Sequence, residues 1–245
     1  IMQEGINEAG AMATWMAAAT SYSTNSYPLI PFYVFYSMFG FQRVGDLAWA
    51  SGDMQARGFL IGGTAGRTTL NGEGLQHQDG HSHVLANTIP NCKAYDPAYG
   101  YEMAVVIRHG MKEMFEDNKN VFYYLTIENE NYEQPAMPKD CEDGIIKGMY
   151  KYESVETKGR KKSPRVQLLG AGAIMNEVRE AAQMLKDDWG VASDVWSVTS
   201  FNELARDGQH VERWNHLHPD DKPRQAYVTQ CLEKAQGPVV SATDY

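Results

Sequence analysis

Two spacings of apolar residues alternate along the first half of the chain. Short, dense apolar runs bounded by Gly or Pro predict buried strands. These runs are the first part of LIPFYVFYSMFGF (29–41), then RGFLIGGTAG, KAYDPAY and NVFYYLTIE. Apolar residues at helical spacing predict helices at residues 5–20, 36–55, 75–86 and 99–116. Regular alternation of strand and helix is typical of an α/β fold, so we expect a mainly parallel sheet with helices on both faces.

The second half of the chain begins after a break in this pattern. NENYEQPAMPKDCEDG (128–144) is rich in proline and acidic residues and is interpreted as a linker. Beyond it, VQLLGAGAIMNEVREAAQML predicts a strand, a glycine turn and a helix, and SDVWSVTSF and PVVSATDY predict two more strands. We therefore predict two α/β domains, at residues 1–138 and 139–245. The chain opens without an initiator Met and stops just after a strand, so we expect a truncated second domain and an incomplete site.

Composition narrows the classes of partner. The 245 residues carry a formal net charge of −9, which argues against nucleic acid or an anionic membrane as the main partner. No stretch approaches the ~20 apolar residues of a membrane span. Cys92, Cys141 and Cys231 form no CxxC pair and no disulfide framework, so we expect a cytoplasmic protein. The basic stretch KGRKKSPR (158–165) is interpreted as a solvated loop.

The glycine turn in LLGAGAIMNEV (168–178) has two interpretations. A turn between a strand and a helix can hold a phosphate on the N–H groups of the helix. However, Met175 occupies the position of the third glycine in G-x-G-x-x-G, and no acidic residue clearly ends a following strand. A tight turn without a ligand is the favoured interpretation.

A group of polar side chains in NGEGLQHQDGHSH (71–83) raises the question of a metal site. Four of them have the chemistry of metal ligands: His77, Asp79, His81 and His83. A zinc-binding helix would more convincingly read H-E-x-x-H, and here Gly80 interrupts the middle. We therefore predict no metal ligands in this chain.

Glu73 and His77 offer a different pairing within the same stretch. On a helix they would be i,i+4 neighbours. A carboxylate beside an imidazole raises the pKa of the imidazole and orients the ring, which suits proton transfer near neutral pH.

GINEAGAM (5–12) places carboxylates on a helix of small and apolar residues. Glu4 is interpreted as an acid favoured by the dipole at the helix start. For Glu8 that interpretation and a partly buried, functional carboxylate both stay open, because a buried carboxylate needs a partner. Nearby, the aromatic residues of PFYVFYSMFGF (31–41) are typical of a core, although a flat cofactor ring would also need such a wall.

These pieces, in this order, resemble a known family. GINEAGAM is similar to the pyrimidine-domain signature of transketolase-like, thiamine-diphosphate-dependent enzymes. STNSYPLIPFYVFYSMFGFQRVGD, GGTAGRTTLNGEGLQHQDGHSH and TIPNCKAYDPAYGYE resemble the homodimeric E1 component of bacterial pyruvate dehydrogenase complexes. Transketolases carry a GEDGPTHQP-like stretch where this chain has NGEGLQHQDGHSH, which argues against a sugar-phosphate substrate.

The resemblance implies roles for six residues. Glu8 matches the glutamate that hydrogen-bonds N1′ of the aminopyrimidine and shares its proton, which would require a raised pKa. Ile6 matches the bulky residue that holds the bent cofactor. Tyr36 and Phe39 match the aromatic wall beside the aminopyrimidine. Glu73 and His77 match a polar pair facing the substrate, in which His77 would bind pyruvate or relay protons and Glu73 would support it.

The resemblance also implies an activity and partners. The activity is oxidative decarboxylation of pyruvate, with reductive acetylation of the lipoyl group of the dihydrolipoyl acetyltransferase (E2). The cofactors are thiamine diphosphate and Mg²⁺, and the assembly is a homodimer. The family's G-D-G…N motif for the diphosphate and Mg²⁺ is not found in this chain, so we expect half a site here. The alternatives are a transketolase, another 2-oxo-acid dehydrogenase, a zinc-binding module, or a non-catalytic segment for assembly.

Overall fold

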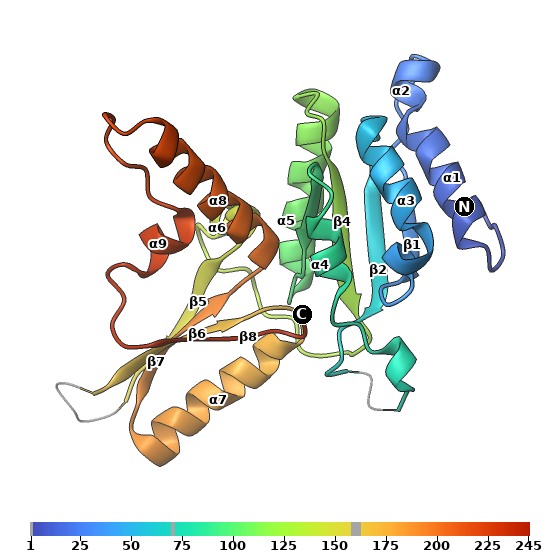
Figure 1. Cartoon of the computed structure of the whole chain (residues 1–245). Helices are drawn as coiled ribbons and strands as arrows, with labels where there is room; N and C mark the ends of the chain where they lie inside the picture. The colour runs from blue at the N-terminus through green and yellow to red at the C-terminus, as the bar shows by residue number, and fades with distance from the viewer. Residues whose placement is uncertain (1, 70–71, 158–162) are drawn as a thin grey trace. The chain divides into compact units, whose positions relative to one another are not determined.

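The computed structural model describes residues 2–69, 72–157 and 163–245 (Figure 1). The chain divides into two compact units. Unit 1 contains the residues up to Asp96, Met103–Glu133 and Asp244–Tyr245, and unit 2 contains Pro97–Glu102 and Gln134–Thr243. The domain boundary at residue 138 stays a prediction. The basic stretch at 158–165 lies mostly outside the described residues.

Unit 1 is built on a four-stranded sheet with the order β1-β2-β4-β3. Its strands are β1 (Phe32–Tyr36), β2 (Phe59–Ala65), β3 (Cys92–Tyr95) and β4 (Phe122–Glu128). Every pair of neighbouring strands is parallel. The predicted α/β fold with a mainly parallel sheet is therefore confirmed in this unit. The carboxyl ends of all four strands meet at one edge, where connecting loops bring distant residues together.

Helices cover both faces of this sheet. The helical segments are α1 (Glu8–Ala19), α2 (Ser21–Thr24), α3 (Gly40–Asp53), η1 (Leu75–His77), α4 (Ser82–Asn87), α5 (Gly100–Met111) and the π-helical turn η2 (Lys112–Glu116). Side chains from α1, α3 and α4 share one core with Phe122 and Tyr124 of β4. Tyr123 alternates with them and points to the opposite face, where Gly110 of α5 packs closely against its ring. Figure 1 shows α1 and α3 side by side on their face.

A glycine fixes the turn between β1 and α3. A Cβ atom at Gly40 would lie 2.0 Å from the ring of Phe35, which is buried in the core. Only a residue without a side chain lets α3 begin this close to the strand. The short turn that carries Tyr36 and Phe39 is therefore held by the core directly beneath it.

Unit 2 contains a mixed sheet with the order β5-β7-β6-β8. Its strands are β5 (Tyr150–Val155), β6 (Arg165–Gly170), β7 (Ala192–Ser197) and β8 (Val239–Ala242). Only β5 is antiparallel to its neighbour. The helices are α6 (Glu142–Lys147), α7 (Ile174–Trp189), α8 (Phe201–Leu217) and α9 (Tyr227–Leu232). The strand, glycine turn and helix predicted from VQLLGAGAIMNEVREAAQML are β6, residues 171–173 and α7.

One predicted helix is wrong. Residues 75–86 do not form a continuous helix, because η1 ends at His77 and α4 begins at Ser82. The Asp79 carboxylate accepts hydrogen bonds from the N–H groups of His81 and Ser82, at 3.0 and 2.9 Å, and so starts a new helix. The predicted linker is also shorter than expected, since α6 begins at Glu142.

Within residues 2–69, 72–157 and 163–245, no helix combines the length and the apolar character needed to cross a bilayer.

Candidate functional site

Three rings gather at the carboxyl edge of the unit 1 sheet. Tyr36 ends β1, Phe39 directly precedes α3, and His77 lies on the loop that follows β2. The ring centroids of Phe39 and His77 are 5.4 Å apart, those of Tyr36 and His77 are 5.9 Å apart, and all contacts are edge-to-face. Tyr36 is 57% exposed, so this aromatic surface is open on one side. Such a surface suits a flat ring of a ligand.

An arginine connects this aromatic group to α1. Arg43 of α3 forms an ion pair with the carboxylate of Glu8, the first residue of α1. The guanidinium also lies over the Phe39 ring, 4.6 Å from its centroid. Glu8 and the aromatic pair, which are far apart in sequence, are thereby joined through Arg43.

The expected raised pKa of Glu8 is not found. Its pKa is lowered, first by a hydrogen bond with backbone at the start of α1 and then by the Arg43 side chain. Burial is too small to reverse this effect, since the Glu8 side chain remains 26% exposed. The apolar sequence around Glu8 indicated a buried carboxylate, but the helix packs its other faces inward and leaves this one facing a cation.

Glu73 and His77 lie together, although not on a helix. The Oε2 atom of Glu73 is 3.4 Å from Nδ1 of His77. The chain reaches this contact through Gly74, which is extended, followed by the single turn of η1. The Nδ1 atom of His77 is buried and has no hydrogen-bond partner. The contact with Glu73 is longer than an ordinary hydrogen bond, so the hydrogen-bonding capacity of this nitrogen is not used within the described residues.

Ile6 does not join this group. It lies on the segment that precedes α1, and its side chain is fully exposed. Its role as a support beneath a cofactor stays a prediction.

The other two histidines of this stretch have different surroundings. Nε2 of His81 lies 2.9 Å from the side-chain amide of Gln42. His83 is buried, with Nε2 3.0 Å from the Thr126 hydroxyl and its ring 4.5 Å from that of Tyr245. Burial lowers the pKa of His83 to about 4, against the opposing charge of Asp79, so this imidazole is neutral at neutral pH. In the described part of the chain, no three His, Cys, Asp or Glu residues are grouped to hold a metal ion.

Sequence reasoning missed Arg43 and the end of the chain. Arg43 lies four residues after Phe39 on α3, a spacing that places both on one helix face, so a signal for it existed. Asp244 accepts hydrogen bonds from the backbone N–H groups of Arg67 and Thr68 across more than 170 residues of sequence. No local pattern indicates a contact over that separation.

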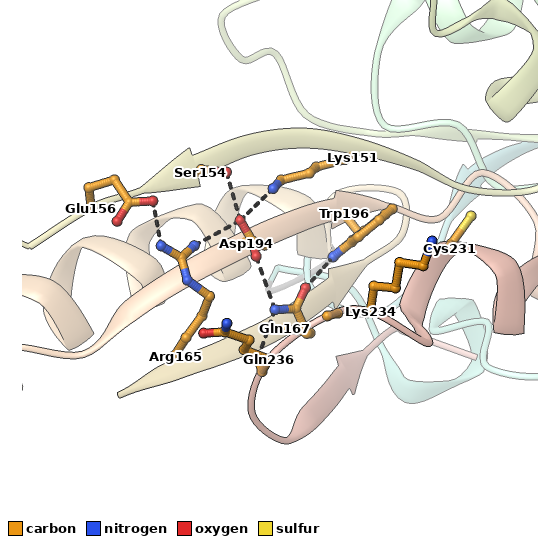
Figure 2. Close-up of a pocket in the computed structure, with 11 residues that line it drawn as sticks. Lys151, Ser154, Glu156, Arg165, Gln167, Asp194, Trp196, Cys231, Lys234 and Gln236 are labelled. Carbon is orange, nitrogen blue, oxygen red and sulfur yellow. Dashed lines mark hydrogen bonds and ion pairs between the residues drawn. The ribbon is translucent and has the colours of Figure 1, made fainter. Parts of the chain in front are cut away.

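Unit 2 contains a separate polar cavity of about 600 Å³. Figure 2 shows Lys151, Arg165 and Gln167 converging on the carboxylate of Asp194. Trp196 donates its indole N–H to Gln167 at 2.8 Å. These groups satisfy one another, so they do not by themselves indicate a ligand.

Two protein families match this chain, each over a different part. Residues 1–135 match the family described as the pyruvate dehydrogenase E1 component middle domain. The chain belongs to the pyruvate dehydrogenase E1 component family. Residues 148–245 match a transketolase-like C-terminal domain. The predicted resemblance to this E1 family is thereby confirmed.

Two E1 relatives align with the whole chain. The pyruvate dehydrogenase E1 component of Pseudomonas aeruginosa is 65% identical over 245 residues, and that of Escherichia coli K12 is 63% identical over 247 residues. Both alignments cover 100% of this chain and 27% of the relative, so the chain spans about a quarter of these E1 proteins. Among solved structures, transketolase from Campylobacter jejuni is similar with a TM-score of 0.70 and 18% identity, over 99% of this chain and 32% of that one. At this identity the likeness concerns the fold alone.

Proposed function

We propose that the parent protein of this chain is a pyruvate dehydrogenase E1 enzyme. It would decarboxylate pyruvate oxidatively with thiamine diphosphate and Mg²⁺, and acetylate the lipoyl group of a dihydrolipoyl acetyltransferase (E2). One structural observation supports the proposal. Contacts at one edge of the sheet bring together four residues: Glu8, Tyr36, Phe39 and His77. Four residues selected by their match to E1 motifs are joined in space in a chain closely similar to proteins of that name.

The surroundings of Glu8 fit the aminopyrimidine ring of thiamine diphosphate. A half-exposed aromatic side chain and a partly exposed carboxylate would contact the face and the edge of such a ring, respectively. When bound, the cofactor would supply the carbanion chemistry that amino-acid side chains lack. Glu8 would hold a proton at the ring nitrogen, and this requires the carboxylate to exchange its ion pair with Arg43 for the cofactor. Removing that cation from the carboxylate would also raise the pKa of Glu8.

His77 and Glu73 would act on the substrate. The Nδ1 atom of His77 makes no hydrogen bond among the described residues, which supports a role in hydrogen bonding to the carboxylate or carbonyl of pyruvate. Glu73, at 3.4 Å, would orient the imidazole. Tyr36 and Phe39 would exclude water from one side of the ring.

The chain would supply half of a site. Ile6 and Tyr36 are exposed in the positions proposed to touch the cofactor, which supports coverage by another surface. The ligands for the diphosphate and Mg²⁺ would come from residues outside this chain, in the partner subunit of a homodimer.

The test is a glutamine substitution in the full-length protein. Pyruvate decarboxylation would be followed with an artificial electron acceptor, with thiamine diphosphate and Mg²⁺ present. Glu8→Gln keeps the shape of the side chain but cannot share the proton, so we expect a loss of about a hundredfold or more. Glu4→Gln is the matched control, because the amide oxygen can still accept the hydrogen bond from Thr14 and activity should be retained.

Each other outcome favours a different proposal. Wild-type activity in Glu8→Gln would favour a non-catalytic role for this segment. Turnover of sugar phosphates or 2-oxoglutarate in preference to pyruvate would favour a transketolase or another 2-oxo-acid dehydrogenase.

A further inference from the structure

A backbone hydrogen bond joins the two ends of the loop that carries Glu73 and His77. We call these two ends, at Gly66 and Asp79, the neck of the loop. The loop leaves β2 at Gly66 and returns at Asp79, where the N–H of Asp79 donates to the carbonyl oxygen of Gly66 at 3.1 Å. The described residues between these two points include the exposed Glu73 and Gly74 and the half-buried His77. The position of His77 therefore depends on how firmly the neck is held.

One carboxylate holds the outgoing side of this neck. Oδ2 of Asp244 accepts hydrogen bonds from the backbone N–H groups of Arg67, at 3.0 Å, and Thr68, at 3.3 Å. Oδ1 of the same carboxylate accepts the Thr68 hydroxyl at 2.7 Å. Three donors on two consecutive residues thus bind one side chain, and hydrogen bonds to a charged acceptor are stronger than neutral ones.

Two features of Gly66 let the Asp244 carboxylate lie close to the backbone. The φ of +74° at this glycine lies in the left-handed region, which strains any residue with a side chain. A Cβ atom at this position would lie only 2.3 Å from Oδ2 of Asp244. The N–H of Gly66 also donates to the hydroxyl of Tyr245 at 3.1 Å.

The returning side of the neck is anchored to the core by different groups. Asp79, which is fully buried, holds the first N–H groups of α4 with Oδ1. His83 of α4 contacts the rings of Tyr124 and Tyr245. Tyr245 therefore contacts both sides of the neck, through its hydroxyl and through its ring.

We propose that Asp244 is a positioning residue for His77. By fixing Arg67 and Thr68, it sets where the 66–79 loop leaves the sheet and how closely His77 approaches Tyr36 and Phe39. This inference rests on the proposed function, because it assigns Asp244 a part in pyruvate turnover. Among the described residues, the hydrogen bonds of Asp244 go to Arg67 and Thr68 and not to Glu8, Tyr36 or Phe39, so we expect cofactor binding to change little when Asp244 is replaced.

We expect removal of the Asp244 carboxylate to change the position of His77 rather than the folding of the chain. Arg67 is exposed, so water replaces Asp244 as the acceptor when the carboxylate is removed. Arg67 and Thr68 are then held less firmly, and a displacement of about 1 Å at a reacting group can cost up to about a hundredfold in rate.

The experiment uses the full-length protein with thiamine diphosphate and Mg²⁺. In Asp244→Asn an amide N–H₂ group faces two backbone N–H donors, or the carbonyl faces them and the Thr68 hydroxyl loses its acceptor. We expect kcat/KM for pyruvate to fall by about tenfold to a hundredfold. The Kd for thiamine diphosphate should stay within about twofold, and trypsin should cleave after Arg67 about tenfold faster. Asp188→Asn, an exposed aspartate on α7, is the matched control and should change none of the three.

A second variant covers the possibility that Asp244→Asn does not fold. Thr68→Val removes only the hydroxyl donor and keeps the shape of the residue, so we expect a fall of a few fold in kcat/KM with the same direction in the trypsin assay.

The outcomes separate the inference from the proposed function. If the wild type turns over pyruvate and both variants match it, the positioning role of Asp244 is refuted. If Asp244→Asn weakens thiamine diphosphate binding as much as it lowers turnover, the role is a general structural one and the proposal is also refuted. If the wild type binds the cofactor but does not turn over pyruvate, the proposed function fails, while faster trypsin cleavage would still report the loop contact.

Discussion

Two groups of polar side chains differ in how fully hydrogen bonds and ion pairs satisfy them. One group surrounds His77 in unit 1, and the other surrounds Asp194 in unit 2. Oδ1 of Asp194 binds Lys151 at 2.6 Å, Arg165 at 2.9 Å and Ser154 at 2.6 Å, and Oδ2 accepts from Gln167 at 3.0 Å. In contrast, Nδ1 of His77 makes no hydrogen bond in the described part of the chain and has the carboxylate of Glu73 at 3.4 Å. A fully paired network has little to offer a ligand, whereas an open group beside an aromatic surface does.

The lowered pKa of Asp194 also shows that its carboxylate is fully paired. Burial alone would raise this pKa, but hydrogen bonds from Lys151, Ser154 and Gln167 lower it to about 2. The carboxylate is therefore held in its charged form by groups of the fold itself, which is the signature of a stabilising network. In the unit 1 group, by contrast, the ion pair of Glu8 with Arg43 lies on a partly exposed surface.

Removing His77 should have the largest effect and should act on activity alone. In the full-length protein, His77→Ala should lower pyruvate turnover by about a hundredfold or more, as for other acid–base groups. The melting temperature should stay within about 2 °C, since the side chain is partly exposed and makes no hydrogen bond through Nδ1 to a described residue. His210→Ala, on the exposed side of α8, is the control. Equal activity in both variants would remove His77 from the site.

Acid should weaken the region of unit 1 around His83 before it weakens the Asp194 network. The pKa of His83 is about 4 in the fold and 6.5 in the unfolded chain, so the unfolded chain binds more protons between these values. Stability is therefore present above pH 6.5 and is lost as pH falls toward 4, by about 3 kcal/mol in total. The pKa of Asp194 is also lowered, from 3.8, so its contribution is lost only between pH 3.8 and about 2.

Hydrogen exchange resolved by peptide can check this order. Protection factors of peptides from α4 should decrease between pH 6.5 and 4, while those of peptides from β7 should stay constant. His83→Gln cannot titrate and should abolish the decrease. Simultaneous loss of protection in α4 and β7 over this range would contradict the prediction.

Removing Asp194 should have the smallest of the three effects and should act on stability alone. Asp194→Ala leaves Arg165 and Lys151 without their shared partner in a side-chain network that is only 10% exposed at its centre. We expect a loss of about 2 kcal/mol of local stability, below the range for fully buried pairs because Lys151 is 46% exposed. Faster exchange in β7 peptides with unchanged kcat would agree. A loss of turnover without faster exchange would instead make this cavity functional.

The sequence predicted every strand except β5, and it predicted α1, α3, α5 and α7, because their apolar spacing is local; β5, α6, α8 and α9 were not predicted. Contacts between residues that are far apart in the sequence were harder to predict. Tyr36 and Phe39 were selected by their match to E1 motifs, and Glu73 and His77 by the same match together with their i,i+4 spacing. The pairing of Glu8 with Arg43 could not be predicted, since it joins two helices, and it reversed the expected pKa shift. The helix predicted across 75–86 failed because Asp79 forms a cap that competes with helix continuation.

The closed neck between Gly66 and Asp79 also bears on how such proteins change through evolution. Residues 72–76 inside the loop are exposed and contribute little to the core, whereas hydrogen bonds at its two ends, including those to Asp244, hold the loop to the rest of the unit. Insertions or substitutions between the ends should therefore be inherited at small cost in stability. A lineage could alter which small molecule is accepted by rewriting this one crossover connection, while the parallel sheet that presents it stays the same.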